Sequence, residues 1–98
     1  MKHAITLMLL FVSIVCNGQK SEDYFNTGVE KYDLEDYRGA IQDFTKAIEL
    51  DPEFAMAYYN RGIARLLLED KDGGCLDLSK AGELGHFKAY DLIKEYCN

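Results

Sequence analysis

The feature that most constrains this chain is an internal repeat: the residues from position 58 onward resemble the residues from position 24 onward. At this repeat offset the run Tyr-Phe-Asn-Thr-Gly at residues 24–28 lies over Tyr-Tyr-Asn-Arg-Gly at residues 58–62, and Asp36 lies over Asp70. A period of about 20 to 50 residues is typical of proteins that stack copies of one small unit. A chain of 98 residues has room for one domain of about two such units. The same offset aligns Phe44 with Leu78, Lys46 with Lys80, Ala47 with Ala81 and Leu50 with Leu84.

Each unit is predicted to begin with a helix. No proline interrupts residues 21–34, where Tyr24, Gly28 and Tyr32 recur at four-residue steps along one helical face. The second unit carries the same pattern and predicts a helix over about residues 54–68. Both helices are followed by a short run of acidic residues, which predicts a turn.

The turn is predicted to lead into a second helix that packs back on the first. In the first unit this helix opens at Tyr37 after the N-cap Asp36, and Pro52 ends it because the residue before a proline disfavours helical geometry. In the second unit Asp72 is the expected N-cap of a helix over about residues 73–84. The apolar stripe of the first of these helices is Ala40, Ile41, Phe44, Ala47, Ile48 and Leu50.

A fifth helix is predicted from His86 to Tyr96, after Gly85, a residue type that often ends helices. Glycines at matched positions, such as Gly28 and Gly62, would let paired helices approach closely, while large side chains fill the space between them. The predicted fold class is therefore all-α, with antiparallel helical hairpins stacked into a short array.

These residues resemble a known family, the tetratricopeptide repeat (TPR). The run DYRGAIQDFTKAIELDP at residues 36–52 is similar to the TPR pattern, and the resemblance extends over residues 21–98. It implies a short right-handed solenoid with repeat 1 at 21–54, repeat 2 at 55–88 and a C-terminal capping helix at 86–97. The residues that carry it are Tyr24, Gly28, Tyr37, Ala40, Phe44, Ala47 and Pro52.

The second repeat departs from the TPR pattern after its turn. Lys71 stands in place of the usual aromatic residue, Gly74 in place of the usual alanine and His86 in place of the usual proline. Its ending, KAGELGHFKAY, resembles the related Sel1-like repeats. Positions that usually hold large apolar residues in the first helices carry Thr27, Lys31, Arg61 and Arg65.

The TPR resemblance implies that the first helices line a concave groove that binds an extended or helical peptide of a protein partner. Phe25 and Tyr59 lie off the stripe that pairs the helices, so they indicate either a contact surface or burial against adjacent helices. Some family members clamp a carboxylate, but only Asn60 and Lys94 match that set here. Self-association of two short arrays into a homo-oligomer is the rival hypothesis. The implied groove residues are Phe25, Val29, Tyr59, Asn60, Ile63, Leu66 and Lys94.

Cys75 and Cys97 lie eleven residues on either side of residue 86, where two antiparallel helices are predicted to meet. Mirrored positions in a helical hairpin are neighbours, so a disulfide between them is reasonable in an oxidising compartment. It would help a short array, because about three stacked repeats are normally needed for stability. The alternative is two small buried thiols.

Residues 1–18 are predicted to be a signal peptide. Lys2 precedes an uncharged run from Ala4 to Val15, which is too short to span a bilayer, and cleavage after Gly18 would release an exported protein, periplasmic or secreted. One alternative is a short buried helix. Another is lipidation at Cys16, which would anchor the protein in the cell envelope, although the preceding residues resemble a lipobox poorly.

The residues after the signal carry ten basic and seventeen acidic side chains, a net charge of −7. Nucleic acid is therefore not expected as a partner, since phosphate contacts need clustered Lys and Arg, and an anionic membrane would be repelled. His86 is the one histidine after the signal, and the sequence contains no Cys-x-x-Cys motif and no Gly-rich phosphate loop. The sequence thus predicts no metal, no cofactor and no catalytic site.

Overall fold

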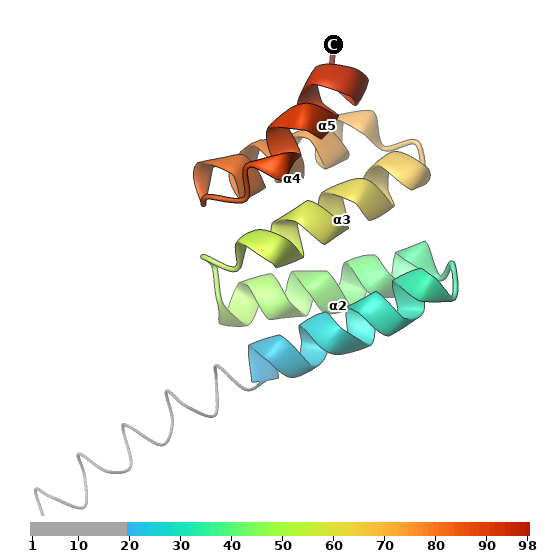
Figure 1. Cartoon of the computed structure of the whole chain (residues 1–98). Helices are drawn as coiled ribbons and strands as arrows, with labels where there is room; N and C mark the ends of the chain where they lie inside the picture. The colour runs from blue at the N-terminus through green and yellow to red at the C-terminus, as the bar shows by residue number, and fades with distance from the viewer. Residues whose placement is uncertain (1–19) are drawn as a thin grey trace, which may run out of the picture.

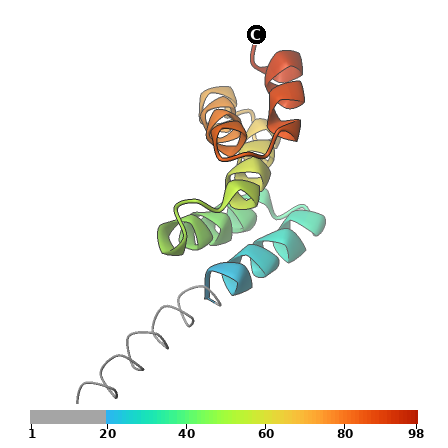
Figure 2. The same cartoon turned by 60° about the vertical axis from the view of Figure 1, so that its left-hand side comes forward.

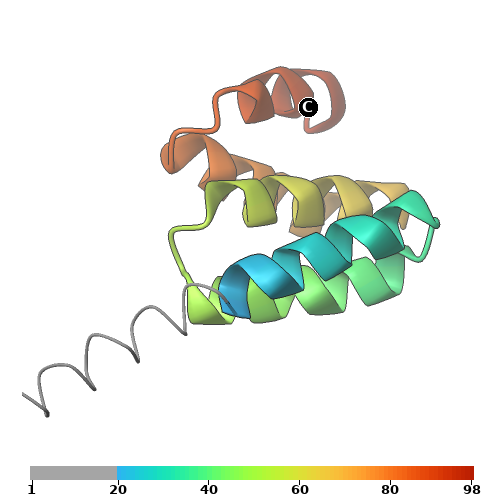
Figure 3. The same cartoon turned by 60° about the horizontal axis from the view of Figure 1, so that its bottom comes forward.

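The computed structural model describes residues 20–98, whose regular secondary structure is entirely helical. Residues 20–33 form a helix that lies beside α2 (Tyr37–Leu50) (Figure 3). The second hairpin consists of α3 (Ala55–Leu67) and α4 (Lys71–Glu83), and α5 (Lys88–Tyr96) packs against α4. The all-α fold of stacked hairpins agrees with the sequence prediction.

The hairpins follow one another in a single stack, with helix 20–33 at one end and α5 at the other (Figures 1 and 2). None of the helices within residues 20–98 combines the length and the apolar character that crossing a membrane requires. The predicted signal peptide at 1–18 and the lipidation candidate Cys16 lie outside the described residues.

Aspartate caps start the second helix of each hairpin, at equivalent positions of the repeat. Asp36 accepts a hydrogen bond from the backbone N–H of Gly39 at 3.0 Å, and Asp70 accepts one from Gly73 at the same distance. The predicted N-cap Asp72 is therefore wrong, because α4 begins two residues earlier than expected. An N-cap oxygen must reach an N–H two or three residues ahead, and Asp70 does so.

The two hairpin turns also share one backbone device. Glu35 and Glu69, again at equivalent positions of the repeat, have positive φ angles of 63° and 65°. This left-handed conformation lets the N–H of the next residue bond back into the helix, from Asp36 to the Lys31 carbonyl at 2.8 Å and from Asp70 to the Arg65 carbonyl at 2.9 Å. The Cβ of glutamate makes a positive φ sterically unfavourable. Glycine, which has no Cβ, could adopt this conformation at either position without that cost.

Small residues bring the paired helices into close contact, as the sequence predicts. A Cβ added at Gly28 would lie 2.6 Å from Cε1 of Phe44, whose ring is fully buried. In the second hairpin a Cβ at Gly62 would lie 3.0 Å from the carbonyl oxygen of Gly74, and one at Gly74 would lie 2.9 Å from that of Gly62. The backbones of α3 and α4 therefore touch directly, and α4 bears Leu78 as its large buried side chain.

The basic residues at normally apolar positions are explained by two buried aspartates. Asp77 accepts hydrogen bonds from Nε and Nη2 of Arg61 at 2.8 and 2.7 Å and from Nη1 of Arg65 at 2.7 Å. Asp77 is only 4% exposed. Arg61 Nη1 also donates to Oγ1 of Thr45 on α2 at 3.2 Å. This network links α3 to α4 within the second hairpin and to α2 of the first.

The first hairpin holds a simpler version of the same pair. Lys31 Nζ lies 3.0 Å from Oδ2 of Asp43, and these two residues are the repeat equivalents of Arg65 and Asp77. Thr27, at the position equivalent to Arg61, donates its hydroxyl to the Asp23 carbonyl of its own helix at 2.9 Å. Ion pairs thus replace apolar contacts between the helices of each hairpin.

Candidate functional site

An apolar cleft lies between α3 and α5, with a volume of about 320 Å³. Leu67 on one wall and Tyr96 on the other are each 50% exposed, so apolar surface remains open to solvent at the rim. No Asp, Glu, Lys or Arg lines this α3–α5 cleft. Its lining consists of Tyr59, Ile63, Leu66, Leu67, Leu92 and Tyr96.

The cleft rests on the buried cluster of Leu78, Ala81 and Ala89. Tyr59 packs against this cluster and against the His86 ring, with centroids 4.2 Å apart. The cleft therefore has a packed floor. The other partly buried side chains on the cluster are Tyr58, Ile63, Leu66, Leu92, Ile93 and Cys97.

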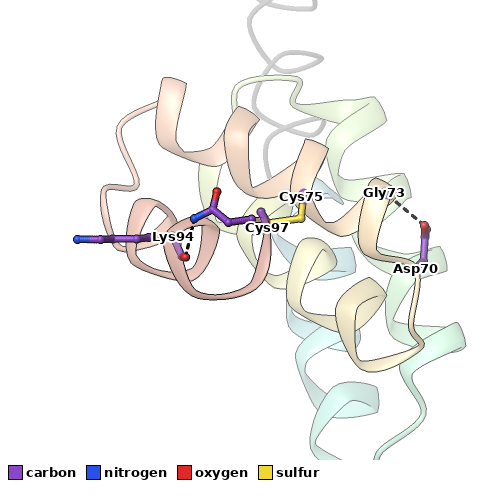
Figure 4. The surroundings of a disulfide bond; sticks show 6 residues. Asp70, Gly73, Cys75, Lys94 and Cys97 are labelled. Carbon is purple, nitrogen blue, oxygen red and sulfur yellow. Dashed lines mark hydrogen bonds between the residues drawn. A yellow bond between two sulfur atoms is a disulfide. The ribbon is translucent and has the colours of Figure 1, made fainter.

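A disulfide between Cys75 and Cys97 holds the far wall of this cleft (Figure 4). Its two Cα atoms are 5.8 Å apart, and Cys97 is the residue directly after α5. At the other end of α5, the Tyr90 ring lies over Gly82 so closely that a Cβ there would be 2.7 Å from Cζ. The helix that carries Leu92 is thus fixed to α4 at both ends.

A second cleft, of about 380 Å³, lies between helix 20–33 and the start of α3. Its floor includes Phe25, whose ring centroid is 4.8 Å from that of Phe54 and 5.7 Å from that of the buried Phe44. Two carboxylates, Glu22 and Asp51, line it together with apolar side chains. We call it the Phe25 cleft, and its lining is Ser21, Glu22, Phe25, Asn26, Asp51, Phe54 and Met56.

The predicted groove residues are distributed over these two clefts and the surface beside them. Tyr59, Ile63 and Leu66 come together in the α3–α5 cleft, whereas Phe25 lies in the second one. Lys94 is exposed, and its side chain extends away from the disulfide (Figure 4). Val29 and Asn60 are half-buried and line neither cleft.

Sequence reasoning missed Leu67, Leu92 and Tyr96 in the first cleft. Leu92 and Tyr96 are four residues apart on α5, a spacing that places them on one helical face, so periodicity was the signal that could have found them. Phe54 and Met56 in the Phe25 cleft were missed because they flank the start of α3.

Within residues 20–98 no three His, Cys, Asp or Glu side chains are grouped so as to hold a metal ion. Burial raises the pKa of the Tyr32 phenol, and the nearby Tyr37 and Asp33 raise it further. The Tyr32 hydroxyl therefore stays protonated at neutral pH and acts as a neutral packing group beside Tyr37, with ring centroids 5.3 Å apart.

A family model described as TPR repeat matches residues 28–68, which run from the middle of helix 20–33 through α2 to the end of α3. The chain contains a tetratricopeptide repeat. TPR repeats generally mediate protein–protein interactions on a scaffold that is not itself catalytic. The match ends before α4, so the resemblance of the later residues to Sel1-like repeats stays a prediction. A comparison with curated proteins finds no match to the chain.

Proposed function

We propose that this TPR protein binds a peptide segment of a protein partner across its concave face, in the α3–α5 cleft, and performs no chemistry of its own. The carrying observation is the cleft itself, which is apolar, open at the rim and lined by three of the predicted groove residues, Tyr59, Ile63 and Leu66. Apolar surface left open between two helices is typical of a contact site. The TPR scaffold makes a protein ligand the expected one.

Rigid walls support this proposal. Tyr59 packs on His86 and on the buried cluster below it, and α5 is fixed by the disulfide. A preformed cleft loses less conformational entropy on binding than a mobile one, which favours affinity. Leu67 and Tyr96 at the rim would lose their exposed surface to the ligand, giving the hydrophobic contribution to binding.

A random-peptide display library tests this function. Peptides enriched on the purified protein should lose binding to Leu67→Asp, which places a charge at the rim of the cleft, since burying that charge is unfavourable. Leu34→Asp is the matched control, because Leu34 is 80% exposed in the turn after helix 20–33. If no peptide is enriched, or if the enriched peptides bind both variants equally, the proposed function is wrong.

We also infer that the protein acts outside the cytoplasm. The uncharged run at residues 4–15 supports export, and a disulfide between Cys75 and Cys97 is compatible with an oxidising compartment. Mass spectrometry of the protein from its own cells tests the inference. An N-terminus at Gln19 would agree with secretion, and a diacylglyceryl group on Cys16 would agree with an envelope lipoprotein. A full-length chain in the cytoplasm would contradict both.

A further inference from the structure

The two clefts open on the same face of α3. Met56 lines the Phe25 cleft, while Tyr59, Ile63 and Leu67 line the α3–α5 cleft. These residues follow Met56 by three, seven and eleven positions, the spacing of one helical face. One ligand segment that crosses α3 can therefore contact both clefts.

The rise along α3 sets a minimum spacing of ligand residues. Met56 and Ile63 are seven residues apart, which corresponds to about 10 Å along a helix that rises about 1.5 Å per residue. An extended peptide advances about 3.3 Å per residue, so about three residues cover this distance. Because the segment must also cross α3, two side chains of the ligand need a separation of at least about three residues to reach the two clefts together.

Charge distinguishes the two clefts. The α3–α5 cleft is uncharged, whereas the Phe25 cleft contains the carboxylates of Glu22 and Asp51 and no Lys or Arg. The cations of α3 do not balance these carboxylates, because Arg61 and Arg65 are both bound to Asp77 on α4. The face therefore offers an apolar cleft at one end and a negatively charged cleft at the other.

We propose that the ligand is a positively charged, extended segment that places a large apolar side chain in the α3–α5 cleft and a Lys or Arg side chain in the Phe25 cleft. The inference rests on the proposed function, since it specifies the ligand of the same face. Glu22 and Asp51 supply the negative charge for the cation, and Phe25 and Phe54 supply apolar surface for the aliphatic part of its side chain.

Defined peptides test the charge and the apolar side chains of the ligand. The probe is the labelled peptide Lys-Lys-Ser-Ser-Phe-Leu, and its matched controls replace the two lysines with Glu-Glu or the Phe-Leu pair with Ser-Ser. Fluorescence anisotropy with the purified protein at low salt should show at least about tenfold weaker binding for the Glu-Glu peptide, because like charges would then meet. Added salt should weaken the Lys-Lys peptide, since salt screens exposed charges.

Protein variants locate the cation. Glu22→Gln should weaken the Lys-Lys peptide about two- to fivefold, the range of one exposed ion pair, and Glu49→Gln on α2 is the matched control and should not. Equal affinity for the Lys-Lys and Glu-Glu peptides, or equal effects of the two variants, overturns the inference while leaving the proposed function intact. If the Lys-Lys peptide fails to bind while display-selected peptides bind through Leu67, the inference is likewise wrong and the function stands. If the display selection and the defined peptides both fail, the proposed function and the inference are both wrong.

Discussion

Removing the disulfide should cost this domain a large part of its stability. The bond closes a loop with a sequence separation of 22 residues, and the loop-closure entropy of such a loop corresponds to about 3 kcal/mol of stabilisation. Small domains have total unfolding free energies of about 5 to 15 kcal/mol. A loss of about 1 kcal/mol lowers the Tm of a domain this size by about 4 to 8 °C. Reduction is therefore expected to lower the Tm by more than about 10 °C.

The loss should be concentrated at α5. This helix has nine residues, of which Ala89 alone is buried, and isolated helices of that length are marginal in water. Without the bond to Cys75, its C-terminal half is held only by half-buried contacts such as those of Leu92 and Ile93. Hydrogen exchange should therefore show lost protection in α5 before any loss in α2.

Thermal unfolding followed by circular dichroism, with and without a dithiol reductant, measures the effect. The double variant Cys75→Ser/Cys97→Ser should melt like the reduced protein and should not respond to the reductant. A reduced protein that melts within about 2 °C of the oxidised one would show that packing alone fixes α5, and the loop-entropy argument would fail. Two reactive thiols in the unfolded, unreduced protein would exclude the bond.

Three further substitutions test the packing of the hairpins by denaturant unfolding. Phe44→Ala should cost about 3 to 5 kcal/mol because its ring is fully buried against Gly28, and an unchanged midpoint would contradict the helix register. Asp77→Ala should cost about 3 to 5 kcal/mol by leaving two guanidinium groups without their shared carboxylate, whereas a loss below about 1 kcal/mol would mean that water replaces it. Glu69→Gly should raise the stability by about 0.5 to 1 kcal/mol because glycine adopts its positive φ without strain, and any decrease would show that the Glu69 side chain stabilises the turn.

The hairpin fold could be predicted because its sequence signals are local and occur in both repeats. Each hairpin repeats its turn and its glycine at the same offset, so two copies identify the pattern where one would be ambiguous. The predicted N-cap of α4 was wrong because Asp70 and Asp72 are both aspartates, a residue type that is favoured at N-caps. Alignment with Asp36 at the repeat offset selects Asp70, the residue that caps in the structure.

The ion pairs between the helices were not predicted, although the sequence holds part of their signal. Lys31 and Arg65 stood out as basic residues at apolar positions, and their partners Asp43 and Asp77 recur at the same offset. A buried carboxylate cannot be recognised from sequence, however, because Asp residues are usually exposed and burial depends on tertiary packing.

The clefts were predicted in part for a similar reason. Tyr59 and Ile63 follow from the helical face of α3, which periodicity gives. The opposite wall, Leu92 and Tyr96, depends on the angle at which α5 leaves the turn after α4. That angle is constrained by the contact of Tyr90 with Gly82 and by the disulfide. The disulfide was predicted from the spacing of its cysteines, but the angle itself depends on packing in three dimensions, which the periodicity of one helix does not give.

Because α5 both closes the stack and forms a wall of the cleft, ligand binding and stability should be coupled. A ligand that contacts both Leu67 and Tyr96 binds only when α5 is folded. At a free ligand concentration of about 100 times its Kd for the reduced protein, it would add about 2.7 kcal/mol to the stability of that protein. This nearly equals the disulfide contribution, so a saturating cleft ligand should return the reduced protein to about the Tm of the free oxidised protein. Leu67→Asp should abolish the rescue. A ligand that binds tightly yet raises the Tm of that variant equally would have to bind elsewhere.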